Sequence, residues 1–316
     1  MKAASYTRKD VVVGVLCAVL IVLTTGAVSK SRSRLTLRRR CAMNLSGLGK
    51  AMLIYANDYD DELPKAGVRN KNQWVPRLPN WAARSRWEAY GVNPGDSTRM
   101  AKVTTTSSLY LLVKYVEVTP KSFVCPAEPE TTPFSLAKVP EELPEGFELI
   151  RAWDFGGRYD DKNNPSRHCS YAYHMPFGRY ALQTACEPGM AVLADRNPWM
   201  DPQRVEDPKL GWARFDPSAS DPNRVRIGNS DAHERAGQNV LFLDLHVSFE
   251  KRPTCGLNDD NIYSTALDAT GAGRTKGRKP RVYDATPPLN REDSMLVQEV
   301  GYNIPMPEAS VSENGR

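Results

Sequence analysis

The sequence lacks the short motifs that mark the commonest catalytic and metal-binding classes. It has no Gly-x-Ser-x-Gly nucleophile elbow and no phosphate-binding loop, and its 6 Cys form no Cys-x-x-Cys pair. A mean hydropathy of −0.51 is too low for a polytopic membrane protein, and 21 Gly are too few for a collagen-like repeat. With 6 Trp and 13 Tyr, the chain is also too aromatic for a wholly disordered protein. Because the nucleophile elbow and the phosphate-binding loop are both missing, an enzyme is the least favoured functional class.

Positive charge is concentrated at the N-terminus. The 316 residues include 42 Lys+Arg and 37 Asp+Glu, but residues 1–40 hold nine of these bases and only one acid, Asp10. The remainder of the chain is therefore net acidic, which argues against nucleic acid as a partner. Basic flanks around an apolar segment indicate instead an N-terminus that meets a lipid bilayer.

The apolar segment is Val11–Val28, which carries no charged residue. As a helix it would extend roughly 27 Å, close to the thickness of a bilayer core. A cleaved secretory signal is one interpretation, but its apolar region is usually shorter and ends at a cleavage site with small residues. Because the basic run Ser29–Arg40 follows at once, we favour an uncleaved transmembrane helix over residues 11–28, preceded by a short basic leader at 1–10.

The helix is expected to continue beyond the apolar segment, over residues 29–62. No Pro occurs between Val11 and Glu62, and Leu63-Pro64 should end the helix because a residue before Pro is pushed out of the α region. Apolar residues recur at intervals of three or four and predict one face that packs on a head domain. These residues are Cys41, Leu45, Leu48, Met52, Tyr55 and Tyr59.

The N-terminus resembles the cleavage and methylation region of prepilins and pseudopilins. Ser5 stands at the position where that family usually has Gly, Tyr6 stands for its aromatic residue, and Asp10 stands for its acid. The segment from Cys41 to Pro64 is also similar to the Cys-x-x-Asn-Leu segment of prepilin-like proteins that end in an H-X9-DG motif. If the leader is cleaved, the resemblance implies that Asp10 neutralises the N-terminal amine of a neighbouring subunit.

A second resemblance lies at residues 230–250, which are similar to the H-X9-DG signature itself. His233 matches its His, Asn239 belongs to its Gly/Asn link, and Asp244 and His246 match the residues after its strand. Ten residues separate His233 from Asp244, and Leu245 replaces the Gly of the motif. We therefore expect the strand pairing to continue through Leu245 without a tight turn of positive φ.

These resemblances imply an α+β, pilin-like fold, with a long N-terminal transmembrane helix packed on a head with an antiparallel sheet. They imply a single-pass pseudopilin-like structural protein of the bacterial inner membrane. Its partners would be the lipid bilayer and other pilin-like subunits or the machinery of a type II secretion or type IV pilus-like assembly. Counting bases after the helix favours a cytoplasmic head, whereas the resemblance implies a periplasmic or extracytoplasmic one, which we adopt. A membrane-anchored binding or scaffold protein that does not polymerise is the alternative.

The head is expected to occupy residues 63–264. Helices are predicted near 81–90 and over 107–115, the latter followed by a strand that ends at Cys125-Pro126. Strands are predicted at 170–173, 190–195 and 239–243, with a further alternating run at 245–249. Residues 265–316 are rich in Gly and bases at their start and lack apolar periodicity, which predicts a linker and a mobile tail.

The head could also carry a polar or metal site. Asp195, His233 and Asp244 all lie near the ends of predicted strands, with Asn239 and His246 close in sequence. A His with two carboxylates can hold a divalent metal or polarise water, which would suit a metal-assisted hydrolase. The favoured alternative is a buried His–Asp hydrogen bond that ties a loop to the sheet, with no cofactor.

The cysteines leave several disulfides open. If the head is extracytoplasmic, one or two disulfides are expected among Cys125, Cys169, Cys186 and Cys255. Cys17 lies in the apolar segment, and Cys41 would then be unpaired or joined to another chain.

Overall fold

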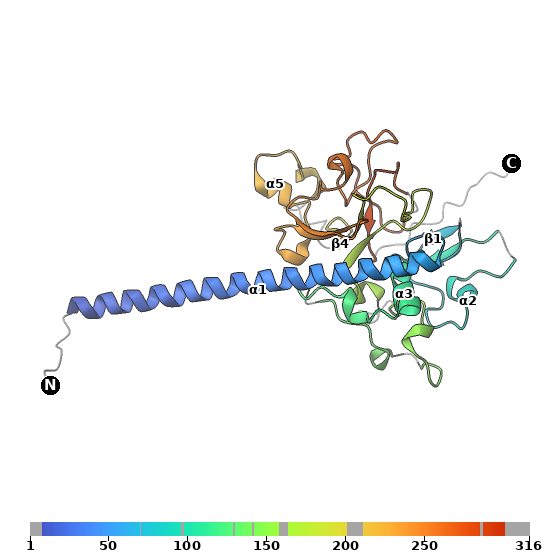
Figure 1. Cartoon of the computed structure of the whole chain (residues 1–316), viewed down its shortest axis with the longest axis horizontal. Helices are drawn as coiled ribbons and strands as arrows, with labels where there is room; N and C mark the ends of the chain where they lie inside the picture. The colour runs from blue at the N-terminus through green and yellow to red at the C-terminus, as the bar shows by residue number, and fades with distance from the viewer. Residues whose placement is uncertain are drawn as a thin grey trace.

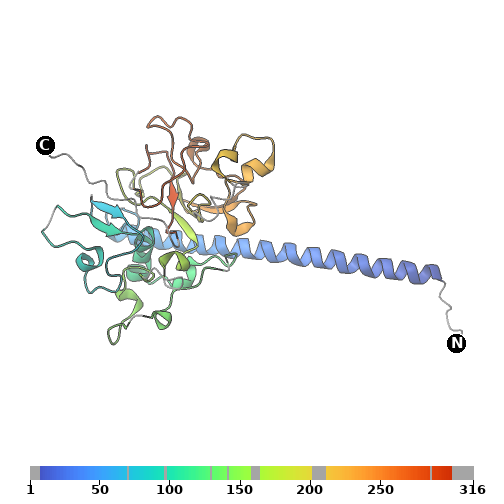
Figure 2. The same ribbon diagram turned by 180° about the vertical axis from the view of Figure 1, so that it is seen from behind.

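A computed structural model describes residues 8–69, 71–95, 98–128, 130–140, 142–157, 164–200, 211–284 and 287–300. Its most prominent element is the 51-residue helix α1, Arg8–Asp58, which passes along the head and continues well beyond it (Figure 1). The view from behind shows the same arrangement, with the head gathered around the C-terminal part of α1 (Figure 2). α1 contains no Pro, and the chain leaves it through Asp60 and Asp61, both at positive φ, just before Leu63-Pro64.

The prediction of a pilin-like fold with a transmembrane N-terminal helix is wrong. Among the described residues, no helix combines the length and the apolar character needed to cross a membrane. This finding also overturns the expected single-pass placement in the inner membrane with a periplasmic head.

One face of the C-terminal part of α1 is buried against the head. Its apolar side chains fill the main core, and α1 packs against helix α3 (Thr105–Val116) and strands β5 (Gln238–Phe242) and β6 (Val247–Glu250). Tyr59, which the periodicity placed on the same face, is 38% exposed and stacks on Tyr55. The fully or nearly fully buried residues of this face are Cys41, Leu45, Leu48, Ala51, Met52, Tyr55 and Ala56.

The head is built on a five-stranded antiparallel sheet in the order β6-β5-β4-β3-β7. Besides β5 and β6 it contains β3 (Tyr171–His174), β4 (Ala191–Asp195) and β7 (Leu296–Val297). The predictions of β3, β4, β5 and β6 are confirmed to within one or two residues. β7 was missed, and it comes from the segment whose composition predicted a mobile tail.

The sheet separates two cores because successive side chains of a strand point to opposite faces. Tyr171 and Tyr173 of β3 point into the core that contains α1 and α3. Ala172, between them, points into a second core that includes Trp199, Phe215, Ile227, Ile262 and Tyr263. Both faces of the sheet are thus covered, so strand residues such as Asp195 are removed from solvent.

Shorter elements complete the head. The helix predicted near 81–90 is α2 (Arg86–Tyr90), and α3 begins with a capping box between Thr104 and Ser107. The strand predicted before Cys125 is absent, because Pro120 starts a 3-10 helix, Pro120–Phe123. A small parallel pair joins β1 (Asn72–Trp74) to β2 (Ala101–Val103). The remaining short helices are Leu136–Lys138, Leu149–Arg151, Pro165–His168, Trp212–Arg214, α5 (Pro222–Arg226), Asp231–His233 and Leu257–Asp259.

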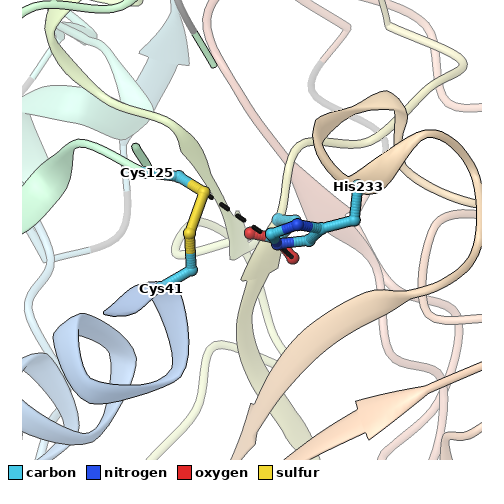
Figure 3. A group of neighbouring side chains, drawn as sticks. Cys41, Cys125 and His233 are labelled. Carbon is cyan, nitrogen blue, oxygen red and sulfur yellow. Dashed lines mark hydrogen bonds and ion pairs between the residues drawn. A yellow bond between two sulfur atoms is a disulfide. The ribbon is translucent and has the colours of Figure 1, made fainter. Parts of the chain in front are cut away.

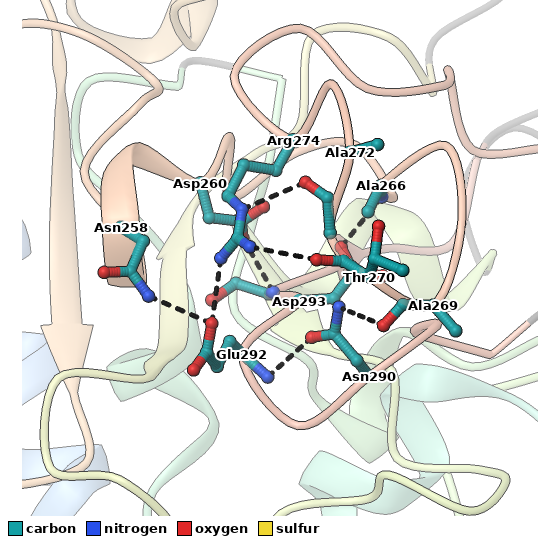
Figure 4. Close-up of polar contacts among 12 residues, drawn as sticks. Asn258, Asp260, Ala266, Ala269, Thr270, Ala272, Arg274, Asn290, Glu292 and Asp293 are labelled. Carbon is teal, nitrogen blue, oxygen red and sulfur yellow. Dashed lines mark hydrogen bonds and ion pairs between the residues drawn. The ribbon is translucent and has the colours of Figure 1, made fainter.

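Residues 265–284 and 287–300 form an integral part of the head instead of a linker and tail. Side-chain to main-chain hydrogen bonds replace regular secondary structure here (Figure 4). The Asp293 carboxylate accepts from Thr265 Oγ1, from the Ala266 amide and from the Leu289 amide. Arg274 pairs with Glu292, whose carboxylate also accepts from Asn258 Nδ2. Such contacts carry no periodic sequence signal, which explains why composition alone suggested a mobile segment.

Candidate functional site

Asp195, His233 and Asn239 meet in the interior of the head. Asp195 ends β4 and Asn239 lies at the start of β5, and the two strands pair at Ala194 and Val240. Asp195 Oδ2 accepts from the Asn239 main-chain N at 2.7 Å and from Asn239 Nδ2 at 3.1 Å. His233 Nε2 lies 3.2 Å from the same Asp195 oxygen and 3.0 Å from Asn239 Nδ2. Three of the five residues proposed for the polar cluster are therefore in contact.

The loop before β5 is shaped to bring His233 against the end of the sheet. His233 ends the 3-10 helix Asp231–His233, whose first turn is capped by Ser230. Glu234 and Arg235 then turn the chain at positive φ, and Gly237, just before β5, has a φ of 148°. A Cβ at Gly237 would lie 2.3 Å from the carbonyl oxygen of Glu250 on β6, so only glycine fits this close approach.

Asp244 and His246 are not part of this buried cluster. They lie in the exposed turn between β5 and β6, where Asp244 Oδ1 accepts from the His246 main-chain N and contacts its imidazole. Leu245 between them has a φ of 72°, so the expectation that pairing would continue through this position is wrong. The hydrolase site of Asp195, His233 and Asp244 is consequently not assembled.

A disulfide between Cys41 of α1 and Cys125 lies directly beside His233 (Figure 3). Cys125 Sγ is 4.0 Å from His233 Nε2. The expectation that Cys41 is unpaired or joined to another chain is therefore wrong. The expectation that Cys125 pairs with another cysteine of the head is wrong too. The other three cysteines proposed for disulfides are free: Cys169 is buried, and Cys186 and Cys255 are partly buried.

The two cysteines of this disulfide, together with Asp195 and His233, form one compact group of possible metal ligands. Single ligand atoms of Cys41, Cys125, Asp195 and His233 all lie within 4.8 Å of one another. Cys41, Cys125 and Asp195 have no exposed surface, and His233 is 7% exposed. Asp195 Oδ1 has no hydrogen-bond partner among the described residues, although the other oxygen of the carboxylate has three close neighbours. We define these four residues as the junction cluster.

Two further buried carboxyls escaped the sequence analysis. Glu299 Oε1 accepts from the Thr105 amide, Thr105 Oγ1 and Trp74 Nε1, while Asp154 Oδ2 accepts from the hydroxyls of Thr104 and Thr106. Burial raises the pKa of Asp154 to about 8 and that of Glu299 to about 7. Both carboxyls lie at the N-terminus of α3, where hydrogen-bond donors converge. A Thr-Thr-Ser-Ser helix start was the only local signal for such a network.

A separate cavity of about 590 Å³ lies near the end of α1. Arg69, Arg179 and Arg291 line it, together with the buried His174. Neither ring nitrogen of His174 has a hydrogen-bond partner among the described residues. Burial lowers the pKa of His174 to about 3, so the ring is neutral and contributes no charge to the cavity.

The processing residues are not placed by the structure. Ser5 and Tyr6 lie outside the described residues, and Asp10 belongs to α1 but its side chain is not among those described. The resemblance to a prepilin cleavage region therefore stays a prediction. Comparison of the chain with protein-family models, curated proteins and solved structures finds no match.

Proposed function

We propose that the protein is a structural subunit that assembles with copies of itself through the protruding part of α1. The observation that carries this proposal is the exposure of apolar side chains on that part of the helix. Val12, Val13, Val15 and Leu16 are each 57–59% exposed. Toward the N-terminus, the head's contact with α1 reaches Arg34, which pairs with Glu234. The helix from Arg8 to Ser33 then extends roughly 39 Å at 1.5 Å per residue.

The distribution of these side chains favours a partner that surrounds the helix. Successive residues of an α-helix are rotated by about 100°, so Val12, Val13 and Val15 project in three different directions. A helix that is apolar on several sides is normally buried on several sides. Neighbouring copies of the same helix in a bundle would provide such burial, and each copy would display its head outside the bundle.

The attachment of the head to α1 suits a structural role. The Cys41–Cys125 disulfide joins the helix covalently to the head, and three residues later Asn44 Nδ2 donates to the Val124 carbonyl and to Tyr171 Oη. Arg38 lies over the ring of Phe249 on β6 at 4.0 Å. A head fixed in this manner follows the orientation of its helix, as a repeating subunit requires.

Assembly can be measured on the full chain by sedimentation velocity and negative-stain electron microscopy. We expect oligomers or filaments whose formation is prevented by the double substitution Val12→Glu and Leu16→Glu, which places two charges on one side of the protruding helix. Met43→Glu is the matched control, because Met43 is an exposed apolar residue of α1 beside the head. This substitution should leave assembly intact.

Two results would contradict the proposal. The first is a full chain that remains monomeric at every concentration tested. The second is assembly that is as sensitive to Met43→Glu as to the double substitution, which would place the contact on the head-proximal surface of α1.

A further inference from the structure

We propose that the junction cluster becomes a zinc site when the Cys41–Cys125 disulfide is reduced. The two thiolates, His233 Nε2 and an Asp195 carboxylate oxygen would be the four ligands. The disulfide and the zinc ion would then be alternative ways of closing the same junction between α1 and the head.

The spacing of the donors fits a tetrahedral ion. Zn–N and Zn–S bonds of about 2.0 and 2.3 Å place a tetrahedral S···N pair about 3.6 Å apart, against 4.0 Å between Cys125 Sγ and His233 Nε2. An N···O pair would be about 3.4 Å apart, against 3.2 Å between His233 Nε2 and Asp195 Oδ2. The two sulfurs must separate to about 3.8 Å, and their Cα atoms already lie 5.1 Å apart. The remaining donor pairs all lie within 4.8 Å.

The surroundings of the cluster also suit a metal. Asn239 holds Asp195 Oδ2, the oxygen nearest His233, through its main-chain N and its Nδ2 atom, as a hydrogen-bonding residue does behind a metal ligand. Asp195 Oδ1 is buried and has no partner among the described residues, so the carboxylate is incompletely paired inside the head without an ion. The ring of Phe249 packs edge-on against His233 and limits its rotation.

Zinc is the cation that this donor set selects. Thiolate and imidazole ligands suit Zn²⁺, whereas Mg²⁺ and Ca²⁺ require six or more oxygen ligands. A closed set of four protein ligands is typical of structural zinc sites, which add to the free energy of folding. The ion would therefore stabilise the junction and would have no open position for catalysis.

The conversion is balanced by a dithiol or phosphine reductant. Two electrons from the reductant break the S–S bond and two protons complete the two thiols: a dithiol supplies both and becomes a disulfide, whereas a phosphine takes oxygen from water, becomes the phosphine oxide, and the water supplies the protons. Binding of Zn²⁺ then displaces one proton from each thiol, because the thiolate is the metal ligand. A small-molecule disulfide reverses the sequence by thiol–disulfide exchange: it takes up the two electrons and leaves as two thiols, and the ion is released when the two cysteine sulfurs join again.

The experiment compares the full chain with and without phosphine reduction under anaerobic conditions. After incubation with Zn²⁺ and desalting, elemental analysis should find one zinc per reduced chain and none per oxidised chain. Co²⁺ in place of Zn²⁺ should give the intense visible bands of a tetrahedral thiolate site. Zn²⁺ should also raise the Tm of the reduced chain and leave the Tm of the oxidised chain unchanged.

Substitutions assign the ligands. Cys125→Ser and His233→Ala should abolish zinc binding, and Asn239→Ala should weaken it roughly 10- to 100-fold by releasing the Asp195 carboxylate. Cys169→Ser is the matched control, because Cys169 is a buried free cysteine outside the cluster. The proposal is overturned if the reduced chain binds no zinc, or if it binds zinc equally well after Cys125→Ser. A reduced chain that unfolds and does not regain its circular dichroism with Zn²⁺ would overturn it too.

Discussion

Gly49 determines how closely α1 can approach the sheet, and it provides a sharp test of the packing. A Cβ built on Gly49 would lie 2.9 and 3.0 Å from the two δ-methyl carbons of Leu241 on β5 and 3.3 Å from Leu245 Cδ2. Contacts below about 3 Å between carbons are strongly repulsive, so either Leu241 must change its rotamer or α1 must move away from the sheet. Gly47, two residues earlier in the same helix, has nothing within 4 Å of its Cβ position.

The two glycines should therefore respond oppositely to alanine. An alanine in a helix interior is favoured over glycine by about 1 kcal/mol, and Gly47→Ala should raise the free energy of unfolding by that amount. Gly49→Ala gains the same propensity but overpacks the core, which typically costs about 1–3 kcal/mol. We expect Gly49→Ala to be less stable than Gly47→Ala by about 2 kcal/mol, the middle of that range.

Urea unfolding followed by circular dichroism would measure both variants under oxidising conditions. A double-mutant cycle with Leu241→Ala identifies the contact, because removal of the leucine side chain should make Gly49→Ala favourable. Equal stabilisation by the two alanine substitutions would refute the close approach of α1 to β5. An unfavourable Gly49→Ala that persists without the Leu241 side chain would show that the repulsion comes from another neighbour.

Three further predictions follow from other contacts. Because burial raises the pKa of Asp154 to about 8, the folded chain holds a proton that the unfolded chain releases above about pH 4, so stability should fall as pH rises from 5 to 8. Asp154→Asn should flatten this fall in urea unfolding at several pH values; an unchanged slope would contradict the assignment. Asn197→Ala should lower the free energy of unfolding by about 3 kcal/mol, because the buried carbonyls of Tyr263 and Leu296 lose their Asn197 Nδ2 donor. Cys41→Ser should lower it by about 4 kcal/mol in oxidising buffer, since the disulfide closes a loop with a sequence separation of 84, and a loss no larger than that of Cys169→Ser would argue against the bond.

The regular part of the head could be predicted because its signals are periodic. Ser170–Tyr173 and Met190–Asp195 were identified as strands from alternation, apolar run length and flanking turn residues, and both lie in the sheet. β7 has only two residues, Leu296 and Val297, which is too short for an alternating pattern to distinguish it from a loop. Its place in the sheet depends on neighbours such as Asn197, which reaches the Leu296 carbonyl from a distant part of the chain.

The candidate site was predictable only in part. Asp195 and His233 were singled out because each lies next to a predicted strand, and their contact follows from the pairing of β4 with β5. The periodicity placed Cys41 on the face of α1 that packs on the head, but its disulfide partner could not be deduced, because no pattern shows which head segment lies beside that turn of the helix. Leu245 was misjudged for a different reason: the turn adopts a positive φ that favours glycine, at a cost of about 1–2 kcal/mol, where the sequence has leucine.

A short stretch of α1 combines several kinds of contact with the head. Cys41, Asn44 and Gly49 span roughly 12 Å, and they supply a covalent bond, two hydrogen bonds and a close approach to Leu241 of the sheet. Toward the protruding end, α1 contacts the head through the Arg34–Glu234 ion pair and then continues beyond it (Figure 1). If copies assemble through that end, the junction cluster is where the assembled helix is joined covalently to its head. The disulfide limits movement of α1 relative to the head. After its reduction, α1 would be held there by the packing of Leu45, Leu48 and Met52, unless zinc replaces the bond.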